Sequence, residues 1–209
     1  MKFFKLASLC AAFILCSGAI FAQGITGSAH DFTSAAWNSS GEICLPCHTP
    51  HNAKTMDEVP LWNHMTTTAT YTMYSNTNSS TFDATPGTEP DGNSKACLSC
   101  HDGTVALENF GDVTTGTTMM TGTRLLSTDL SNDHPISFVF DAALATLDGE
   151  LHDPTTQTTA KGGTIDNDML FATKMQCASC HDPHNTDGFD HMMRFDNAAS
   201  ALCLTCHNK

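Results

Sequence analysis

Cysteine and histidine recur in this 209-residue sequence in one fixed order. Four copies of the pattern Cys-x-x-Cys-His are present: Cys44-Leu-Pro-Cys47-His48, Cys97-Leu-Ser-Cys100-His101, Cys177-Ala-Ser-Cys180-His181 and Cys203-Leu-Thr-Cys206-His207. This pattern is the attachment motif of c-type haem. Two thiols one helical turn apart reach the two vinyl groups of a porphyrin, and the histidine that follows lies under the iron as its proximal ligand. The sequence therefore predicts four covalently bound haem c groups.

Three other uses of paired cysteines fit the motifs less well. A disulfide framework has no reason to place a histidine after every second cysteine. A thioredoxin-like redox site is expected within a βαβ pattern, which this sequence lacks. Zinc sites built from four cysteines would leave every histidine redundant. The motifs use all cysteines of the chain except Cys10 and Cys16, so haem attachment is the predicted chemistry.

Seven histidines lie outside the motifs and are candidates for the second, distal position on an iron: His30, His51, His64, His134, His152, His184 and His191. An electron carrier fills both axial positions, whereas a haem enzyme keeps one position open for its substrate. Four irons need four distal ligands, so the surplus favours four bis-histidine haems and a chain that is not an enzyme. Methionine ligation would raise the haem potential, but methionine is more often core filler.

Two candidates follow a proximal histidine at a spacing of three, in His48-Thr-Pro-His51 and in His181-Asp-Pro-His184. Residues three apart on a helical turn lie on one side of it, so they cannot approach one iron from opposite faces. We therefore expect His51 and His184 each to serve a different haem from the one beside them. This requires neighbouring haems to lie close together.

The surroundings of the other candidates differ. His64 and His134 lie beside residues that would fix the ring, a tryptophan two positions earlier and a proline one position later. Both are expected to be ligands. His30 fits either role, ligand or solvated residue. His152 and His191 lie in polar surroundings and are expected to be solvated.

The first residues have the pattern of an export signal. Lys2 and Lys5 precede an almost wholly apolar run over residues 6–21, and Ala22 offers a small residue for cleavage before Gln23. This predicts a secretory signal peptide over residues 1–22. The run lacks the stop-transfer flank of a membrane-spanning helix and is shorter than the roughly 20 apolar residues that such a helix needs. We expect an exported chain that does not span the membrane.

The charge of the chain excludes one class of partner. The formal net charge is −13, from 22 acidic and 9 basic residues. Loss of Lys2 and Lys5 with the signal peptide would make it −15. So acidic a surface repels phosphate backbones, which excludes nucleic acid as a partner.

Residues 23–209 are expected to form a single tetrahaem domain that is mostly coil, organised around its four haems. Fewer than 50 residues are available per haem, so the porphyrins are expected to form the core, at about 25 cal/mol per Å² of buried apolar face. The Thr- and Ser-rich stretches between motifs could not fold unaided. We expect short helical turns at the motifs, a strand over 136–140, a helix over 141–147 and a compact haem pair within 177–209.

Two parts of the chain resemble a known family. The segment Cys44–Asn52 and the doubled motif from Cys177 to His207 resemble the doubled CxxCH multihaem cytochromes. The likeness is greatest to OmcE-like extracellular tetrahaem cytochromes, which polymerise into filaments called cytochrome nanowires. The segment Gly188–Phe195 and the ending Leu202–Lys209 look like the C-terminal haem pair of hexahaem filament relatives of the OmcS type. The middle, residues 101–177, matches less specifically.

This resemblance implies electron transfer along an extracellular or cell-surface filament. It also implies that one distal histidine crosses a subunit boundary, so that His51 of one subunit would bind the iron of the haem at Cys177 and Cys180 of its neighbour. Partners would be further copies of the chain, other multihaem cytochromes and extracellular electron acceptors. A diffusible, monomeric periplasmic tetrahaem shuttle is the alternative, and a multihaem reductase with a five-coordinate haem is a third possibility.

The resemblance leaves four histidines to compete for the other three haems. They are His30, His64, His134 and His184. One of them must then be spare, and the two candidates for that role are His30 and His64.

Overall fold

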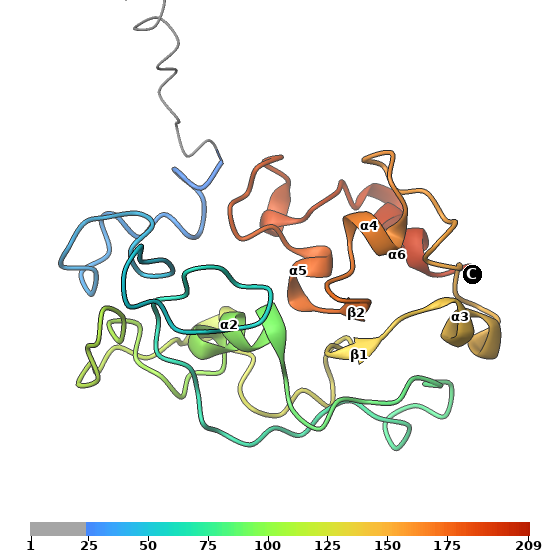
Figure 1. Ribbon diagram of the computed structural model, residues 1–209, viewed down its shortest axis with the longest axis horizontal. Helices are drawn as coiled ribbons and strands as arrows, with labels where there is room; N and C mark the ends of the chain where they lie inside the picture. The colour runs from blue at the N-terminus through green and yellow to red at the C-terminus, as the bar shows by residue number, and fades with distance from the viewer. Residues whose placement is uncertain (1–23) are drawn as a thin grey trace, which may run out of the picture.

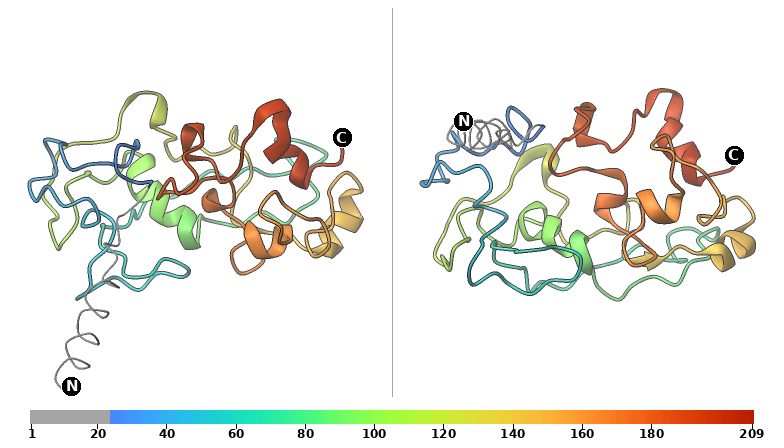
Figure 2. Two further views of the ribbon diagram at one scale, coloured as in Figure 1. Left: turned by 90° about the horizontal axis from the view of Figure 1, so that it is seen from above. Right: turned by 45° about the horizontal axis from the view of Figure 1, so that its top comes forward.

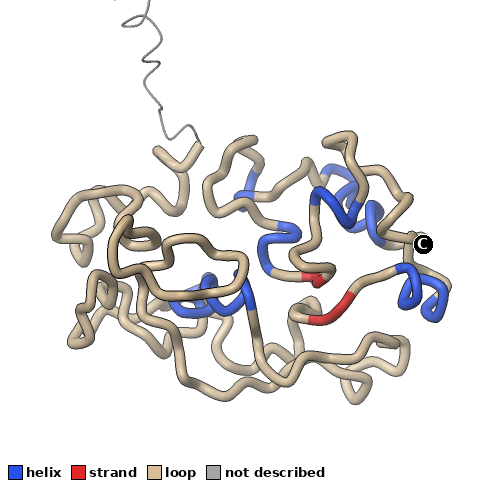
Figure 3. The backbone as a smooth tube through the Cα atoms, viewed as in Figure 1, coloured by secondary structure: helices blue, strands red, loops and turns tan. Residues whose placement is uncertain are grey.

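The structure, a computed structural model, describes residues 24–209, so the predicted signal peptide over 1–22 lies outside the described residues. Coil predominates, as Figure 3 shows, which confirms the prediction of a mostly coil fold with short helices and few strands. The elements are α2 (Gly92–His101), η1 (Gly122–Arg124), β1 (Phe138–Val139), α3 (Ala142–Asp148), α4 (Ile165–Asp168), β2 (Lys174–Met175), α5 (Cys177–Cys180), η2 (Asp190–Met192), η3 (Ala198–Ser200) and α6 (Ala201–Cys206). Within this part of the chain no helix is long and apolar enough to cross a bilayer.

The strands β1 and β2 form a two-stranded antiparallel sheet, with Phe138 opposite Met175 and Val139 opposite Lys174. Phe138 faces the core, whereas Val139 is 46% exposed on the other face. The strand predicted over 136–140 is therefore confirmed in position, but it is only two residues long. Ser137 has a φ of 59°, and this left-handed backbone prevents the extended conformation from starting earlier.

The helix predicted over 141–147 is observed as α3. Asp141 caps its start, since its side chain accepts a hydrogen bond of 2.9 Å from the backbone N–H of Leu144. Gly149 ends it in the left-handed conformation, with a φ of 74°, and donates its N–H back into the helix. Leu144 is buried and Leu147 is 68% exposed, so one face of α3 packs on the core.

All four attachment motifs lie on helical turns, as predicted. The second motif ends α2, the third forms α5 and the fourth ends α6. The first lies outside any assigned helix but closes one helical turn, because the N–H of His48 donates to the carbonyl of Cys44 at 2.8 Å. Residues three apart on such a turn share a side, so both thiols of each motif can face one porphyrin edge.

Apolar packing is uneven along the chain. One cluster of buried side chains joins β1, α3, α4, β2 and α6, which Figures 1 and 2 show gathered toward the C-terminus. Its members are Phe138, Phe140, Leu144, Ala145, Ile165, Met169, Leu170, Met175, Phe195, Leu202 and Cys206. A second cluster holds only Tyr71, Leu98 and Leu130. Residues 138–206 thus supply a core of apolar side chains of their own, and the contribution of the porphyrins stays a prediction.

Two leucines of α3 provide a matched test of this core. Leu144→Ala should lower the free energy of unfolding by about 2–5 kcal/mol, since it leaves a cavity among buried side chains. Leu147→Ala removes an exposed side chain from the same helix and should change it by less than about 0.5 kcal/mol. Denaturant unfolding of the purified holoprotein measures both, and equal effects of the two variants would contradict this core.

Candidate haem sites

The eight motif cysteines are all free thiols. Burial raises the pKa of Cys47 and Cys180 to about 11, and that of Cys100 and Cys206 to about 12. These four are the second cysteines of the four motifs, so each motif has at least this thiol partly or fully shielded from solvent.

Cysteines of successive motifs lie close enough to interact with one another. The neighbouring pairs are Cys47 with Cys100, Cys97 with Cys177, and Cys180 with Cys203. The interaction between the thiols of Cys97 and Cys177 raises the pKa of Cys97 and lowers that of Cys177. The four attachment points therefore follow one another in space in the order in which they occur along the chain.

Three proximal histidines face a second imidazole. The ring centres of His48 and His184 are 6.1 Å apart and nearly parallel, at 19°. Those of His101 and His30 are 6.2 Å apart, and those of His207 and His134 are 6.4 Å apart. A metal–imidazole bond is about 2 Å long, so two imidazoles on opposite sides of one metal have ring centres about 6 Å apart. Each of the three pairs fits a metal ion held between two rings.

The ring nitrogens of these histidines are oriented by backbone carbonyls. Nδ1 lies within hydrogen-bonding distance of a carbonyl oxygen in His30 (Pro183, 3.1 Å), His48 (Pro60, 2.8 Å), His101 (Arg124, 2.9 Å), His134 (Pro135, 2.9 Å) and His181 (His191, 3.1 Å). An imidazole that donates from Nδ1 keeps the lone pair of Nε2 free for a metal, and metal-binding histidines almost always have such a partner. The sequence could not reveal these partners, because a backbone carbonyl leaves no mark on residue type.

Burial lowers the pKa of three histidines below the ordinary value: His30, His64 and His207. Their imidazoles are therefore neutral at pH 7, which is the form that binds a metal.

The fourth proximal histidine, His181, faces no second imidazole within the described chain. Among residues 24–209 no imidazole faces its ring at a comparable distance. His51 is exposed and likewise has no ring partner within the described chain. One proximal histidine and one candidate distal histidine thus remain unmatched.

The structure keeps His64 away from the proximal histidines. Its side chain is 1% exposed, and Nδ1 lies 2.9 Å from the carbonyl oxygen of Met65. Its Nε2 lies 3.6 Å from Sγ of Cys100. His152 and His191 also lack a ring partner in the described region. His64 is thus buried beside the second attachment motif, and its role as a ligand stays a prediction.

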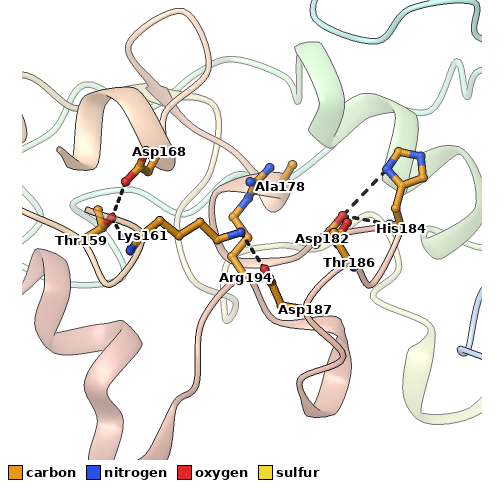
Figure 4. Close-up of polar contacts among 9 residues, drawn as sticks. All are labelled: Thr159, Lys161, Asp168, Ala178, Asp182, His184, Thr186, Asp187 and Arg194. Carbon is orange, nitrogen blue, oxygen red and sulfur yellow. Dashed lines mark hydrogen bonds and ion pairs between the residues drawn. The ribbon is translucent and has the colours of Figure 1, made fainter. Parts of the chain in front are cut away.

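The loop that carries His184 is fixed by polar contacts, which Figure 4 shows. The carboxylate of Asp182 accepts the backbone N–H of His184 at 3.0 Å and that of Thr186 at 2.7 Å. Lys161 forms an ion pair of 2.6 Å with Asp187 in the same loop. These contacts hold His184 on the outside of the third motif, where it faces His48 of the first.

His30 reaches the second motif because the N-terminal segment lies on this same loop. The Asn185 side-chain amide donates to the carbonyl of Gly24 at 3.3 Å. Gly24 has a φ of 105°, and a Cβ at this position would collide with the Asn185 carbonyl oxygen. Only glycine allows the two segments to approach so closely.

A cavity of about 500 Å³ lies next to the third and fourth motifs. It is lined by Phe189, Met193 and Phe195 among others, and by His191, whose carbonyl orients His181. Its lining also includes Asp190, Asp196 and Asn197, so the hollow is partly polar. By contrast, the His, Cys, Asp and Glu side chains of residues 24–209 form no group of three or more that could hold a metal ion alone. A porphyrin iron needs only two protein ligands, which is what the pairs provide.

The C-terminal part of the chain matches a known protein family. Residues 170–209, which contain the third and fourth motifs, match the family described as the doubled CXXCH motif. No curated protein matches the chain.

Loss of one attachment site should be visible in the protein mass. Replacing both cysteines of the third motif, in Cys177→Ala with Cys180→Ala, should lower the mass of the purified protein by one haem and leave three attached. His152→Ala removes no motif cysteine and keeps the backbone N–H that donates to the Cys206 carbonyl, so it should keep all four. Intact mass spectrometry distinguishes these outcomes, and a double variant that still carries four haems would refute the assignment.

The motifs, the facing imidazoles and the family match together support a multihaem c-type cytochrome, with covalently bound haem c and a role in electron transfer.

Proposed function

We propose that this chain is a tetrahaem c-type cytochrome that polymerises into an extracellular filament and conducts respiratory electrons along it. The electrons would pass to other multihaem cytochromes or to extracellular acceptors. The predicted signal peptide over residues 1–22, the four attachment motifs and the resemblance to filament-forming cytochromes support this proposal.

Each residue of the site has a defined role in it. The two cysteines of each motif anchor one haem, and three imidazole pairs bind from opposite sides: His48 with His184, His101 with His30, and His207 with His134. Haem iron held between two histidines takes up and releases one electron and leaves no position for a substrate. The carbonyls on Nδ1 keep the rings oriented, and the loop contacts of Asp182 keep His184 opposite His48.

The filament proposal rests on the third motif, whose proximal histidine has no imidazole partner within the described chain. His181 lacks an imidazole partner within the described chain, whereas His51 is exposed and unpaired. We infer that His51 of one subunit completes the site at His181 of the next. Exposed apolar side chains lie near both ends of this contact, Leu61 (51% exposed) close to the first motif and Phe189 close to the third. Their burial would favour association.

The His51→Ala variant tests the link between subunits. It should keep four haems by mass but form no filaments in electron micrographs, since the attachment cysteines are untouched. His152→Ala is the matched control and should assemble like the natural chain. Filaments from His51→Ala would show that the donor is misassigned. A natural chain that stays monomeric with four six-coordinate irons would instead support the periplasmic shuttle.

Spectra of single variants test the ligand pairs. His30→Ala, His134→Ala and His184→Ala should each convert one haem from low spin to high spin, because one axial ligand is lost. His64→Ala should convert none, since this ring faces no proximal histidine. Optical and EPR spectra of the purified variants report the change. A high-spin signal in His64→Ala together with its absence in one of the other three would reassign the pairs.

A further inference from the structure

Two attachment helices are joined directly by buried polar side chains. The helices α2 and α5 lie beside each other near the middle of the molecule (Figure 1). The contact also places Cys97 next to Cys177. These thiols belong to the second and third motifs, so the contact sets the approach of two haem sites.

The first turn of α5 is capped by side chains of α2. Ser94 Oγ accepts the backbone N–H of Cys177 at 2.9 Å, and Asn93 Oδ1 accepts that of Ala178 at 3.1 Å. The first N–H groups of a helix have no partner inside the helix, so a side chain from elsewhere must satisfy them when they are buried. Here the partners come from the neighbouring attachment helix.

A third side chain completes the network from the α5 side. The hydroxyl of Ser94 donates to the side-chain carbonyl of Gln176, which also accepts from Ser137 at 3.2 Å. The amide of Gln176 donates to Asp91 at 2.6 Å, just before α2 begins. Ser94 is 0% and Gln176 2% exposed. These buried hydrogen bonds fix the approach of the two helices, because each bond is directional and costly to lose.

Glycine at position 92 makes this approach possible. Gly92 has a φ of 48°, and a Cβ there would lie 2.8 Å from Glu58 Oε2 and 3.2 Å from Gln176 Nε2. A larger residue would therefore push α2 away from the segment that leads into α5.

Resting on the proposed function, we propose that Asn93, Ser94 and Gln176 are positioning residues that set the electronic coupling between the haems bound on α2 and α5. They hold Cys97 against Cys177 and so fix how the two haems meet. None of the three is a motif cysteine or a histidine. Haem attachment and axial ligation should therefore not depend on them.

The test is a double variant, Asn93→Ala with Ser94→Ala, in the full secreted holoprotein. Intact mass should still show four haems. The Soret couplet in visible circular dichroism, which arises from haems in contact, should lose most of its amplitude, and the spread of potentials in a redox titration should change. An unaltered couplet and titration in a variant with four haems would overturn the proposal.

Two further variants separate positioning from general stability. Asn93→Asp keeps the Oδ1 acceptor and replaces Nδ2, which has no hydrogen-bond partner, with a second oxygen. Its negative charge lies beside the N–H groups at the start of α5, so the variant should keep the couplet. If the double variant does not accumulate, Ser94→Ala alone leaves the Asn93 bond in place and should weaken the couplet. Loss of the couplet in Asn93→Asp but not in Ser94→Ala would also refute the proposal.

The test of the positioning residues does not depend on whether the chain polymerises. A natural chain with four haems but no Soret couplet would overturn the positioning role while leaving the filament untouched. Conversely, a natural chain with a strong couplet that never forms filaments would remove the filament and leave the positioning role standing.

Discussion

The facing of two imidazoles across about 6 Å is the contact on which the rest of this structure depends. His48 belongs to the first motif and His184 to the loop after the third, so their pairing ties together segments more than 130 residues apart. His30 and His101 tie the N-terminal segment to α2 in the same way, and His134 and His207 join the middle of the chain to its end. Segments far apart in the chain thus lie close together at three pairs of rings. An iron held between the rings of each pair would link those segments, and such links would not require long helices or a large sheet.

Polar side chains stabilise the loops and the starts of the helices. Asp182 closes the loop of His184, Asp141 starts α3, and Ser94 with Asn93 cap α5 from a different helix. Short polar side chains compete well for backbone groups in turns, which explains why a chain rich in Thr, Ser, Asn and Asp can be ordered with so few regular elements. The apolar cluster around Phe140 and Ile165 is confined to the C-terminal half. The N-terminal half relies on the histidine pairs and on small contacts such as that of Gly24 with Asn185.

The sites also follow one another in space. Cys47 lies near Cys100, Cys97 near Cys177 and Cys180 near Cys203, so neighbouring motifs follow the chain order. Attachment points that neighbour one another from first to last would suit transfer of electrons along a line better than chemistry at one centre. His181, which faces no second imidazole in the described chain, belongs to the third motif. The exposed His51 follows the first motif. The proposal of a filament connects these two unpaired imidazoles.

The sequence alone predicted haem attachment, because the Cys-x-x-Cys-His spacing brings two thiols and a histidine together on one helical turn. It also predicted the scarcity of regular structure, the helix at 141–147, and that a histidine three residues after a proximal one must face a different site. Only the tertiary structure decided which rings meet. His30, which could have been a ligand or a solvated residue, faces His101, whereas His64, beside a tryptophan that suggested a fixed ring, is buried against Cys100 and Met65. Such pairings depend on loop paths, on carbonyl partners such as Pro60 and Arg124 and on one close approach at Gly24, and these are long-range backbone contacts that residue types along a chain do not encode.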